Sequence, residues 1–562
     1  MGLYRNKNKK NTGKTIRKDR RGVRKPGTVN KKAAAVQTAA EQGPVSESQA
    51  PEAGAKNVMT ADPSRVFHYF RQISAIPHGS HHTKAISDYL AAFAQERGLS
   101  YVQDEANNVI IAKEASEGCE SAQPIALQGH IDMVLASEPD KEIDLLQEPI
   151  TIVEDGDWMR ADGTTLGADN GIAVAIMLAI LEDETAAHPY LECIFTSDEE
   201  VGLIGATAID LSGLKSRRLL NLDSEEEGVF CAGCAGGAEV VCRMPLKWKT
   251  RRGKILHIMV SGLRGGHSGS EIHIGSANAN VLLARILYGL FEEYPMRLVR
   301  IGGGDADNAI PTNAAASVLF PHAADAERVE ALFRGMAEEM EQEYKVTDPD
   351  MRWKAEWEET DGVRAASKKL TENLLGYLMA VPNGVTHMSP VIRQMPQTSL
   401  NLGILRTDKE GVKLEFMVRS GVNSQTTYLC DRLVCLTKGF GGEAVVRSSY
   451  PAWEYRQDSP FRDLCVSTYR ELTGKEPGVE VIHAGLECGI LAGKLEGLDC
   501  ISAGPDLENV HTVKERMKIS SVEAVWTFVR RLLEAAAAGE QPEKTVSEEE
   551  QPEETVPDED LD

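Results

Sequence analysis

The chain lacks the segments that direct proteins into or across membranes. No apolar run reaches the roughly 18 residues that a membrane-spanning helix needs, and the longest, Ile172–Leu181, is bounded by Gly171 and Glu182. The basic start is not followed by an apolar stretch, so no secretory signal is expected. The ten cysteines among 562 residues are ordinary usage for reduced thiols. Together these absences predict a cytoplasmic protein without a membrane partner.

The signatures of several enzyme classes are also missing. The sequence contains no Gly-x-Ser-x-Gly nucleophile elbow, no Walker phosphate-binding loop and no His-Glu-x-x-His zinc motif. Cys231 and Cys234 form a single Cys-x-x-Cys pair, and because no second pair accompanies it, structural thiols are the expected role.

Charge is abundant but unevenly placed. The net charge is −24, which argues against nucleic acid as the main partner of the folded part. Residues 1–32 nevertheless contain 13 Lys and Arg, and residues 540–562 contain 11 acidic residues. We predict a disordered basic extension over 1–58 and a disordered acidic tail over 540–562. The extension could bind RNA, act as a solubilising arm, or precede a true start at Met59.

Between these tails, strand and helix patterns alternate. Apolar runs that predict strands occur at 109–112, 124–127, 191–196, 219–222, 479–482 and 501–503. Helical spacing lies between most of them, which predicts the α/β class with a mainly parallel sheet and helices on both faces. From Lys254 to Trp453 the pattern changes to α+β, with a hairpin predicted over 402–418.

This change of pattern predicts an interrupted catalytic domain. Its first part is expected over 59–236 and its second over 452–539. An inserted α+β lid domain is expected over 237–451. In open α/β sheets, ligands bind at the carboxyl ends of the strands, so polar residues that follow the predicted strands are the candidates for a site.

The first candidates follow a predicted strand as His130-Ile-Asp132. His130 can bind a metal ion through one ring nitrogen while Asp132 accepts the proton of the other. Glu199 and Glu200 follow a second predicted strand, and because neighbouring side chains of an extended segment point in opposite directions, one can bind metal while the other activates water.

Three further candidates come from separate segments. Asp169 directly precedes a predicted helix, Asp223 follows a strand, and His511 follows the last predicted strand. Each alone is more simply a helix cap or a polar loop residue. Together with the first group they provide the imidazole and carboxylate ligands that suit zinc, with manganese or cobalt as substitutes.

The same segments carry a family resemblance. The matching motifs are Gln-Gly-His130-Ile-Asp132-Met, Asp-Gly-Thr-Thr-Leu-Gly-Ala-Asp169-Asn170-Gly, Asp-Glu199-Glu200, Asn-Leu-Asp223-Ser-Glu-Glu-Glu, Gly-Leu-Arg-Gly-Gly-His267-Ser-Gly, Asn308-Ala-Ile-Pro and His483-Ala-Gly-Leu-Glu-Cys-Gly. The chain resembles the aminoacyl-histidine dipeptidases, also called cytosolic non-specific or Xaa-His dipeptidases, of the di-zinc aminoacylase/carboxypeptidase superfamily. The resemblance runs from about Pro63 to Ala538 and leaves out both tails.

The resemblance implies a site for two zinc ions. His130 and Asp223 would hold one ion, Glu200 and His511 the other, and Asp169 would bridge them. It also implies a cis peptide bond after Asp169.

The resemblance further assigns roles outside the ligand set. Asp132 would orient the imidazole beside it, and Glu199 would be the general base. His267, in the inserted lid, would stabilise the oxyanion after the lid closes. Asn308 and Arg419 would bind substrate, the latter through the peptide carboxylate.

The resulting hypothesis is a metallopeptidase that hydrolyses dipeptides, Xaa-His and a broader range, as a monomer or homodimer. Two alternatives stay open at this point. One is a related amidohydrolase, such as an aminoacylase, a deacetylase or a tripeptidase, because the lid pocket rather than the metal ligands selects the substrate. The other is a non-catalytic metal- or RNA-associated protein that uses the basic extension.

Overall fold

The computed structural model describes residues 62–539, which belong to a single compact unit. The predicted basic extension over 1–58, the alternative start at Met59 and the predicted acidic tail over 540–562 lie outside the described residues.

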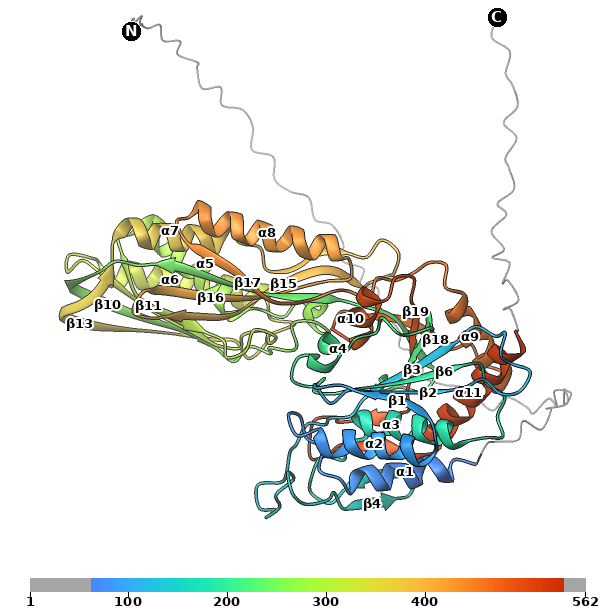
Figure 1. Cartoon of the computed structure of the whole chain (residues 1–562). Helices are drawn as coiled ribbons and strands as arrows, with labels where there is room; N and C mark the ends of the chain where they lie inside the picture. The colour runs from blue at the N-terminus through green and yellow to red at the C-terminus, as the bar shows by residue number, and fades with distance from the viewer. Residues whose placement is uncertain (1–61, 540–562) are drawn as a thin grey trace, which may run out of the picture. The chain divides into compact units, whose positions relative to one another are not determined.

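The first of two large sheets has eight strands and is mainly parallel (Figure 1). In spatial order its strands are β1 (Ser100–Gln103), β2 (Val109–Lys113), β6 (Leu191–Thr196), β3 (Ile125–His130), β7 (Arg218–Asn221), β19 (Asp499–Ser502), β8 (Val229–Cys234) and β18 (Gly478–Ile482). The central strands β6, β3, β7 and β19 run parallel. Antiparallel pairing occurs at the β1–β2 edge, between β2 and β6, and between β19 and β8. The predicted α/β class is confirmed.

Helices cover both faces of this sheet. One face packs against α1 (Ser64–Ser74), α2 (Lys84–Glu96), α3 (Ala168–Glu182), α9 (Pro460–Thr473) and α11 (Ile519–Ala538), and the other against α4 (Ile204–Ala208) and α10 (Glu487–Lys494). α3 is apolar on all sides, and β3 and β6 are buried along their whole length, as expected for strands between two helical layers. None of the described helices is long and apolar enough to cross a bilayer.

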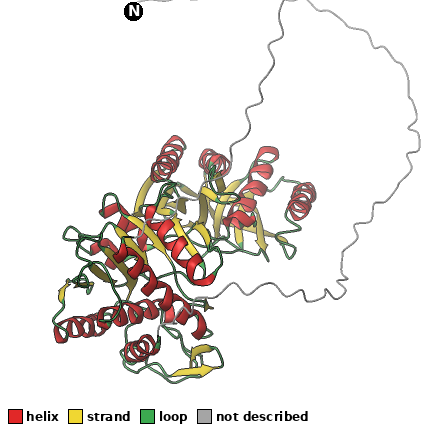
Figure 2. Ribbon diagram, turned by 90° about the vertical axis from the view of Figure 1, so that its right-hand side faces the viewer, coloured by secondary structure: helices red, strands yellow, loops and turns green. Residues whose placement is uncertain are grey.

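The second sheet has nine strands, all from residues 236–450. They are β9 (Gly236–Pro245), β10 (Trp248–Ser261), β11 (Arg297–Gly303), β12 (Ala314–Phe320), β13 (Arg352–Ala366), β14 (Gly384–Met388), β15 (Pro396–Thr407), β16 (Gly411–Ser420) and β17 (Glu443–Tyr450). Its main core lies under α5 (Ala279–Glu293), α6 (Ala326–Glu343), α7 (Lys368–Ala380) and α8 (Asn423–Gly439), which form a separate helical layer (Figures 1 and 2).

This sheet is built from two copies of a βαββαβ unit. One copy is β10-α5-β11-β12-α6-β13, with the spatial order β13-β10-β12-β11. The other is β9-α7-β15-β16-α8-β17, with the equivalent order β17-β9-β16-β15. The copies join where β11 and β15 pair antiparallel. The first copy is inserted into the second after β9.

A small antiparallel sheet connects two loops beside the first large sheet. Its order is β20 (Leu507–Glu508), β21 (Arg516–Lys518), β5 (Trp158–Ala161) and β4 (Ile152–Asp155). Because β21 pairs with β5, the loop over 509–515 lies beside the loop over 162–167. The first loop carries His511, and the second leads to Asp169.

Candidate metal centre

Three neighbouring parallel strands end at the same edge of the eight-stranded sheet and present polar side chains there. β3 ends at His130. β6 is followed by Glu199 and Glu200, and β7 is followed two residues later by Asp223. Since parallel strands share a carboxyl edge, these four residues, far apart in sequence, lie close together.

Asp169 reaches this edge from the first turn of α3. β3 and α3 approach closely because residue 129 is glycine: a Cβ atom on Gly129 would lie 2.5 Å from the Asn170 Oδ1 atom. Asn170 donates to the backbone oxygen of Leu222 at 2.9 Å and also to the carboxylate of Asp223. The peptide bond between Asp169 and Asn170 is cis, as the resemblance implies.

Of the five side chains expected to bind metal, four converge on the fifth, Asp169. Its Oδ1 atom lies 3.1 Å from His130 Nε2, and its Oδ2 atom lies 3.0 Å from His511 Nε2. His511 Nε2 is also 2.9 Å from Glu200 Oε1, and His130 Nε2 is 3.5 Å from Asp223 Oδ1. The ligand atoms therefore form two groups that share Asp169.

Asp132 lies directly behind the centre and is nearly inaccessible to solvent. Its carboxylate accepts hydrogen bonds from Ser80 Oγ at 2.8 Å and from the backbone N–H groups of Glu199 at 2.9 Å and Glu200 at 3.3 Å. His130 Nδ1 is 3.0 Å from the backbone oxygen of Asp132 and 3.5 Å from its carboxylate. Asp132 thus contacts the imidazole and also fixes the loop that carries both glutamates.

The centre holds more negative charge than its two histidines can balance. Hydrogen bonds to Asp169 and Glu200 raise the pKa of His511 to about 11. Burial raises the pKa of Glu199 well above its ordinary value, and burial raises that of Glu225 to about 7. An environment of this kind favours positive charge, whether a proton or a metal cation.

The donor atoms fit a metal ion. Imidazole nitrogen and carboxylate oxygen suit zinc, with manganese and cobalt also compatible. The Glu200 Oε1 atom is buried and makes no well-aligned hydrogen bond, although His511 Nε2 is 2.9 Å away. A buried carboxylate oxygen without a hydrogen bond is costly in a fold unless it binds a cation. A third group of potential ligand atoms joins Glu199 to His130 and Glu200.

Comparison with known proteins gives this centre a family. Residues 126–535 match the model of peptidase family M20/M25/M40, which covers every residue of the centre. The chain belongs to this family. It is 35% identical over 479 residues to the cytosol non-specific dipeptidase of Escherichia coli, covering 85% of this chain and 98% of the relative.

A solved relative supports the same fold for this family member. The crystal structure of aminoacylhistidine dipeptidase from Vibrio alginolyticus matches with a TM-score of 0.79 and 35% identity, over 85% of this chain and 98% of that one. A Bacillus subtilis protein, YqjE, is 28% identical over 262 residues, which is 44% of this chain and 63% of the relative.

Glu515 is a buried residue of this peptidase that sequence reasoning missed. Its carboxylate accepts hydrogen bonds from four consecutive backbone N–H groups, those of Leu166 at 2.8 Å, Gly167 at 3.1 Å, Ala168 at 2.8 Å and Asp169 at 3.3 Å. It lies four residues after His511, so it connects the segments of two expected ligands. Only its polar character is visible in the sequence, and nothing there signals burial.

A second missed acidic residue, Glu487, lies beneath the centre at the start of α10. Glu487 is fully buried and accepts from Gln128 Nε2 at 2.5 Å and Thr196 Oγ1 at 2.6 Å. Asn221 donates in turn to Gln128 at 2.6 Å. These partners sit on β3, β6 and β7, so the network ties together the three strands that end at the centre. The signal available in the sequence was the presence of polar residues, such as Gln128 and Asn221, within otherwise apolar strands.

The expected lid residues His267 and Arg419 contact each other but not the carboxylates of the candidate metal centre. Arg419 Nη2 is 3.4 Å from His267 Nε2, and Arg419 Nη1 donates to the Tyr450 hydroxyl at 3.0 Å. Arg419 is only 5% exposed, its Nε atom has no hydrogen-bond partner, and no carboxylate in residues 62–539 pairs with it. In that range, neither residue bonds to the metal-centre side chains.

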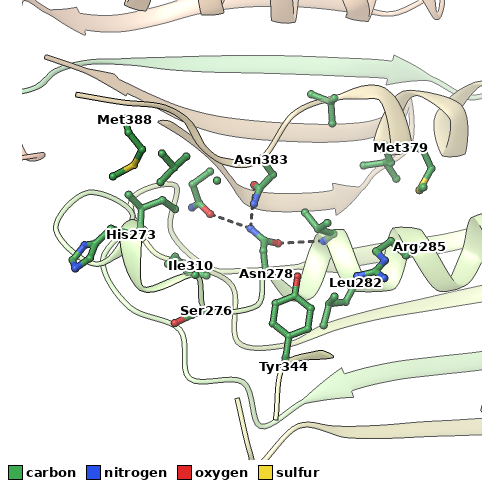
Figure 3. Close-up of a pocket in the computed structure, with 18 of the residues that line it drawn as sticks. His273, Ser276, Asn278, Leu282, Arg285, Ile310, Tyr344, Met379, Asn383 and Met388 are labelled. Atoms are coloured by element: carbon green, nitrogen blue, oxygen red, sulfur yellow. Dashed lines mark hydrogen bonds between the residues drawn. The ribbon is translucent and has the colours of Figure 1, made fainter. Parts of the chain in front are cut away.

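Asn308 lies on an exposed loop whose backbone is fixed by hydrogen bonds from the side chain of Asn401. Asn401 donates to the carbonyl oxygens of Asp307 at 3.1 Å and Ala309 at 2.7 Å, on either side of Asn308. Asn401 also accepts from Asn278 at 3.0 Å, within a wall of a cavity of about 800 Å³ (Figure 3). The expected site residues do not line this cavity.

Proposed function

We propose that this chain hydrolyses dipeptides with the help of two metal ions, with zinc as the ion used and manganese or cobalt as substitutes. The observation that carries the proposal is the convergence of two histidines and two further carboxylates on Asp169, within a chain of which 85% aligns with a named dipeptidase. His130 and Asp223 would hold one ion and Glu200 and His511 the other, with Asp169 between them.

Bound ions would supply Lewis acidity. Glu199 would act as the general base, which takes a proton from the attacking water and returns it to the leaving amine. Its backbone N–H is held by Asp132 at 2.9 Å, and its carboxylate belongs to the group formed with His130 and Glu200. Asp132 acts as the residue that orients the loop and the imidazole of His130.

Arg419 is the residue we assign to the free carboxylate of the peptide. A buried guanidinium without a counter-ion is unfavourable, and an anionic substrate group would supply the missing charge. A planar guanidinium also matches a carboxylate in a bidentate pair. An anchor at one fixed position limits how many residues separate the carboxylate from the cleaved bond, which favours dipeptides.

His267 and Asn308 complete the site when residues 237–451 close over it as a lid. The chain crosses between the two sheets at positions that pair with each other, since Cys234 N–H donates to Trp453 O at 2.9 Å. Two adjacent crossings form a narrow connection about which the lid can move. Closure would exclude water and bring His267 and Asn308 to the substrate, where His267 would stabilise the oxyanion.

A substrate panel tests the proposal. The chain is stripped of metal with a chelator, restored with zinc, and assayed for release of free amine from dipeptides including β-alanyl-histidine, from tripeptides and from N-acetyl amino acids. We expect hydrolysis of dipeptides that requires the restored metal. Faster hydrolysis of N-acetyl amino acids or tripeptides would contradict the substrate assignment, and full activity without metal would contradict the mechanism.

A further inference from the structure

A cleft opens at one end of the nine-stranded sheet, where β12 stops. β12 ends at Phe320, which pairs with Lys254 of β10. β10 continues past this point, where it pairs with β13 alone. The register of that pairing shifts between Arg251 and Gly253. β11 begins on the other side of β12 with Arg297. The space between β10 and β11 is a cleft of about 530 Å³.

Basic side chains line this cleft, and no acidic side chain does. The basic residues are Arg251, Arg252, Arg297 and Lys368. Within the described part of the chain, none of the four forms an ion pair with a carboxylate. Other basic residues of the same sheet and its helices, such as Arg243, Arg285 and Arg334, do pair with acidic neighbours.

Two guanidinium groups in the cleft lie close enough to disfavour each other. Burial and then the nearby charge of Arg251 lower the pKa of Arg297. The Nε atom of Arg251 is buried and has no hydrogen-bond partner. Like charges without a counter-ion, together with an unsatisfied buried donor, destabilise this end of the sheet unless an anion binds there.

The start of α7 adds to the positive potential. α7 begins with Lys368 and Lys369, and its first turn contains no acidic residue. Lysine at a helix N-terminus is unfavourable, because the backbone N–H groups already carry partial positive charge there. The same arrangement is favourable for a bound anion, which interacts with the helix terminus and with Lys368 at once.

We propose that this cleft binds a small anion with two linked phosphoryl groups, either inorganic pyrophosphate or the diphosphate of a nucleotide. Four cationic side chains exceed what one orthophosphate needs, and guanidinium groups pair with phosphate in a bidentate manner. The chain carries a net charge of −24, so binding depends on this local concentration of positive charge rather than on the molecule as a whole.

The proposed site is separate from the candidate metal centre. The two have no residue in common, and the residues that line the cleft all belong to the nine-stranded sheet, its connecting loops and the start of α7. The proposal therefore stands whether or not the chain hydrolyses dipeptides.

Isothermal titration calorimetry of the full chain with pyrophosphate tests the site. The test variant is Arg251→Gln/Arg297→Gln. The matched control is Arg328→Gln/Arg334→Gln, which removes two exposed charges from α6 and keeps the metal centre and the basic extension unchanged. We expect the affinity to fall at least tenfold in the test variant, to stay unchanged in the control, and to weaken as salt is added.

Two further measurements separate the possible results. Lys368→Gln, a single exposed substitution, should weaken binding at least threefold even if the double variant folds poorly. Titration with orthophosphate and with a nucleoside diphosphate identifies the ligand: pyrophosphate and the diphosphate should both bind more tightly than orthophosphate. Equal pyrophosphate affinity in all variants would overturn the proposal, since binding would then occur elsewhere. Equal affinity for orthophosphate would overturn the requirement for two phosphoryl groups.

Discussion

The carboxylate of Glu515 accepts a hydrogen bond from the backbone N–H of Asp169 at 3.3 Å, and three preceding N–H groups point to the same carboxylate. Asp169 is the side chain on which the candidate metal centre converges. One buried acid therefore fixes the backbone from which the shared ligand projects, and it does so without taking part in the centre.

Replacing Glu515 with glutamine should weaken metal binding while preserving the fold. The amide keeps the size of the side chain but loses its charge and places N–H groups against the backbone donors. Residues that orient metal ligands typically contribute roughly 10- to 100-fold to affinity. Competition with a chromophoric chelator would measure the change. Glu508→Gln, which alters an exposed neighbour paired with Arg516, is the control and should bind metal normally.

Glu199→Ala should abolish turnover and leave metal bound. A general base contributes roughly 100- to 10,000-fold to the rate, whereas the five expected ligands are intact in this variant. Activity on a dipeptide and metal content by mass spectrometry, measured on the same sample, would check both parts. Normal activity would remove Glu199 from the role of base, and loss of the metal would make it a ligand instead.

Arg419→Met should reduce activity without destabilising the chain. Losing one partner of a buried charge pair costs about 2 kcal/mol or more, which is roughly a 30-fold fall in kcat/KM. The loss should be smaller for dipeptide amides, which lack the carboxylate. Because Arg419 is buried and pairs with no carboxylate of residues 62–539, the melting temperature should stay the same or rise. Equal losses for peptides and their amides would argue against carboxylate binding.

Glu182→Gln should lower stability near pH 7 but not in acid. Burial opposes ionisation of Glu182, but hydrogen bonds with Arg97, Tyr69 and Arg65 prevail and lower its pKa. A carboxyl group whose folded pKa is lowered stabilises the fold above its unfolded pKa of about 4.3, and this contribution is lost only as the pH falls from there through the lowered folded pKa. We expect Tm to fall by roughly 1–2 °C at pH 7, with the difference disappearing once the pH is below the lowered pKa of Glu182.

A neighbouring glutamate provides the control for the pH dependence of Tm in the Glu182→Gln variant. Glu184→Gln changes an exposed glutamate two residues away that forms no ion pair within residues 62–539. Its Tm should match the unchanged chain at each pH. A Glu182→Gln deficit that stays the same as the pH falls below the lowered pKa of Glu182 would show that the charge of Glu182 is not the cause.

A thiol reagent at neutral pH should label Cys435 first. Cys435 is exposed and Cys119 partly so, while the other eight cysteines are buried. Burial raises the pKa of Cys193 and Cys234 to about 12, so these thiols are protonated and unreactive. Mass spectrometry after timed labelling would show the order, and Cys435→Ser should remove the fast phase. Fast labelling of Cys234 would instead favour a redox role for the Cys-x-x-Cys pair.

The centre of the eight-stranded sheet could be predicted because its inner strands, such as β3 and β6, are buried on both faces. Leu191–Thr196 was predicted to the residue, and the strand ending at His130 was predicted with the correct end region. Continuous apolar runs of this kind leave a clear signal in the sequence. The predicted hairpin over 402–418 is confirmed by β15 and β16, which pair around the turn at Lys409.

Most strands of the nine-stranded sheet could not be predicted from continuous apolar runs. Its edge strand β13, Arg352–Ala366, alternates charged and half-buried residues over most of its length and contains Gly362. One of its faces carries only a small apolar cluster, so apolar runs are short. The pairing of β9 with β16, whose residues are far apart in sequence, cannot be inferred from local pattern at all.

Some residues of the candidate site could likewise be predicted from the sequence, and others could not. The expected ligands that follow buried strands, such as Glu200 and Asp223, are marked by their position. Glu515 and Glu487 are not, because their roles depend on burial produced by distant segments. The contact of Arg419 with His267 likewise arises only from tertiary structure.

The nested order of the strands delays completion of both sheets during synthesis. β9 cannot pair with β16 and β17 until those strands have been synthesised. Likewise, β8 cannot pair with β18 until Gly478–Ile482 has been synthesised. A growing chain therefore exposes unpaired strand edges until most of its length has been translated. Such long-range pairing slows folding and exposes nascent chains to aggregation. Premature termination before β18 would yield a product whose eight-stranded sheet lacks β18 and β19, and which also lacks the segment that carries His511.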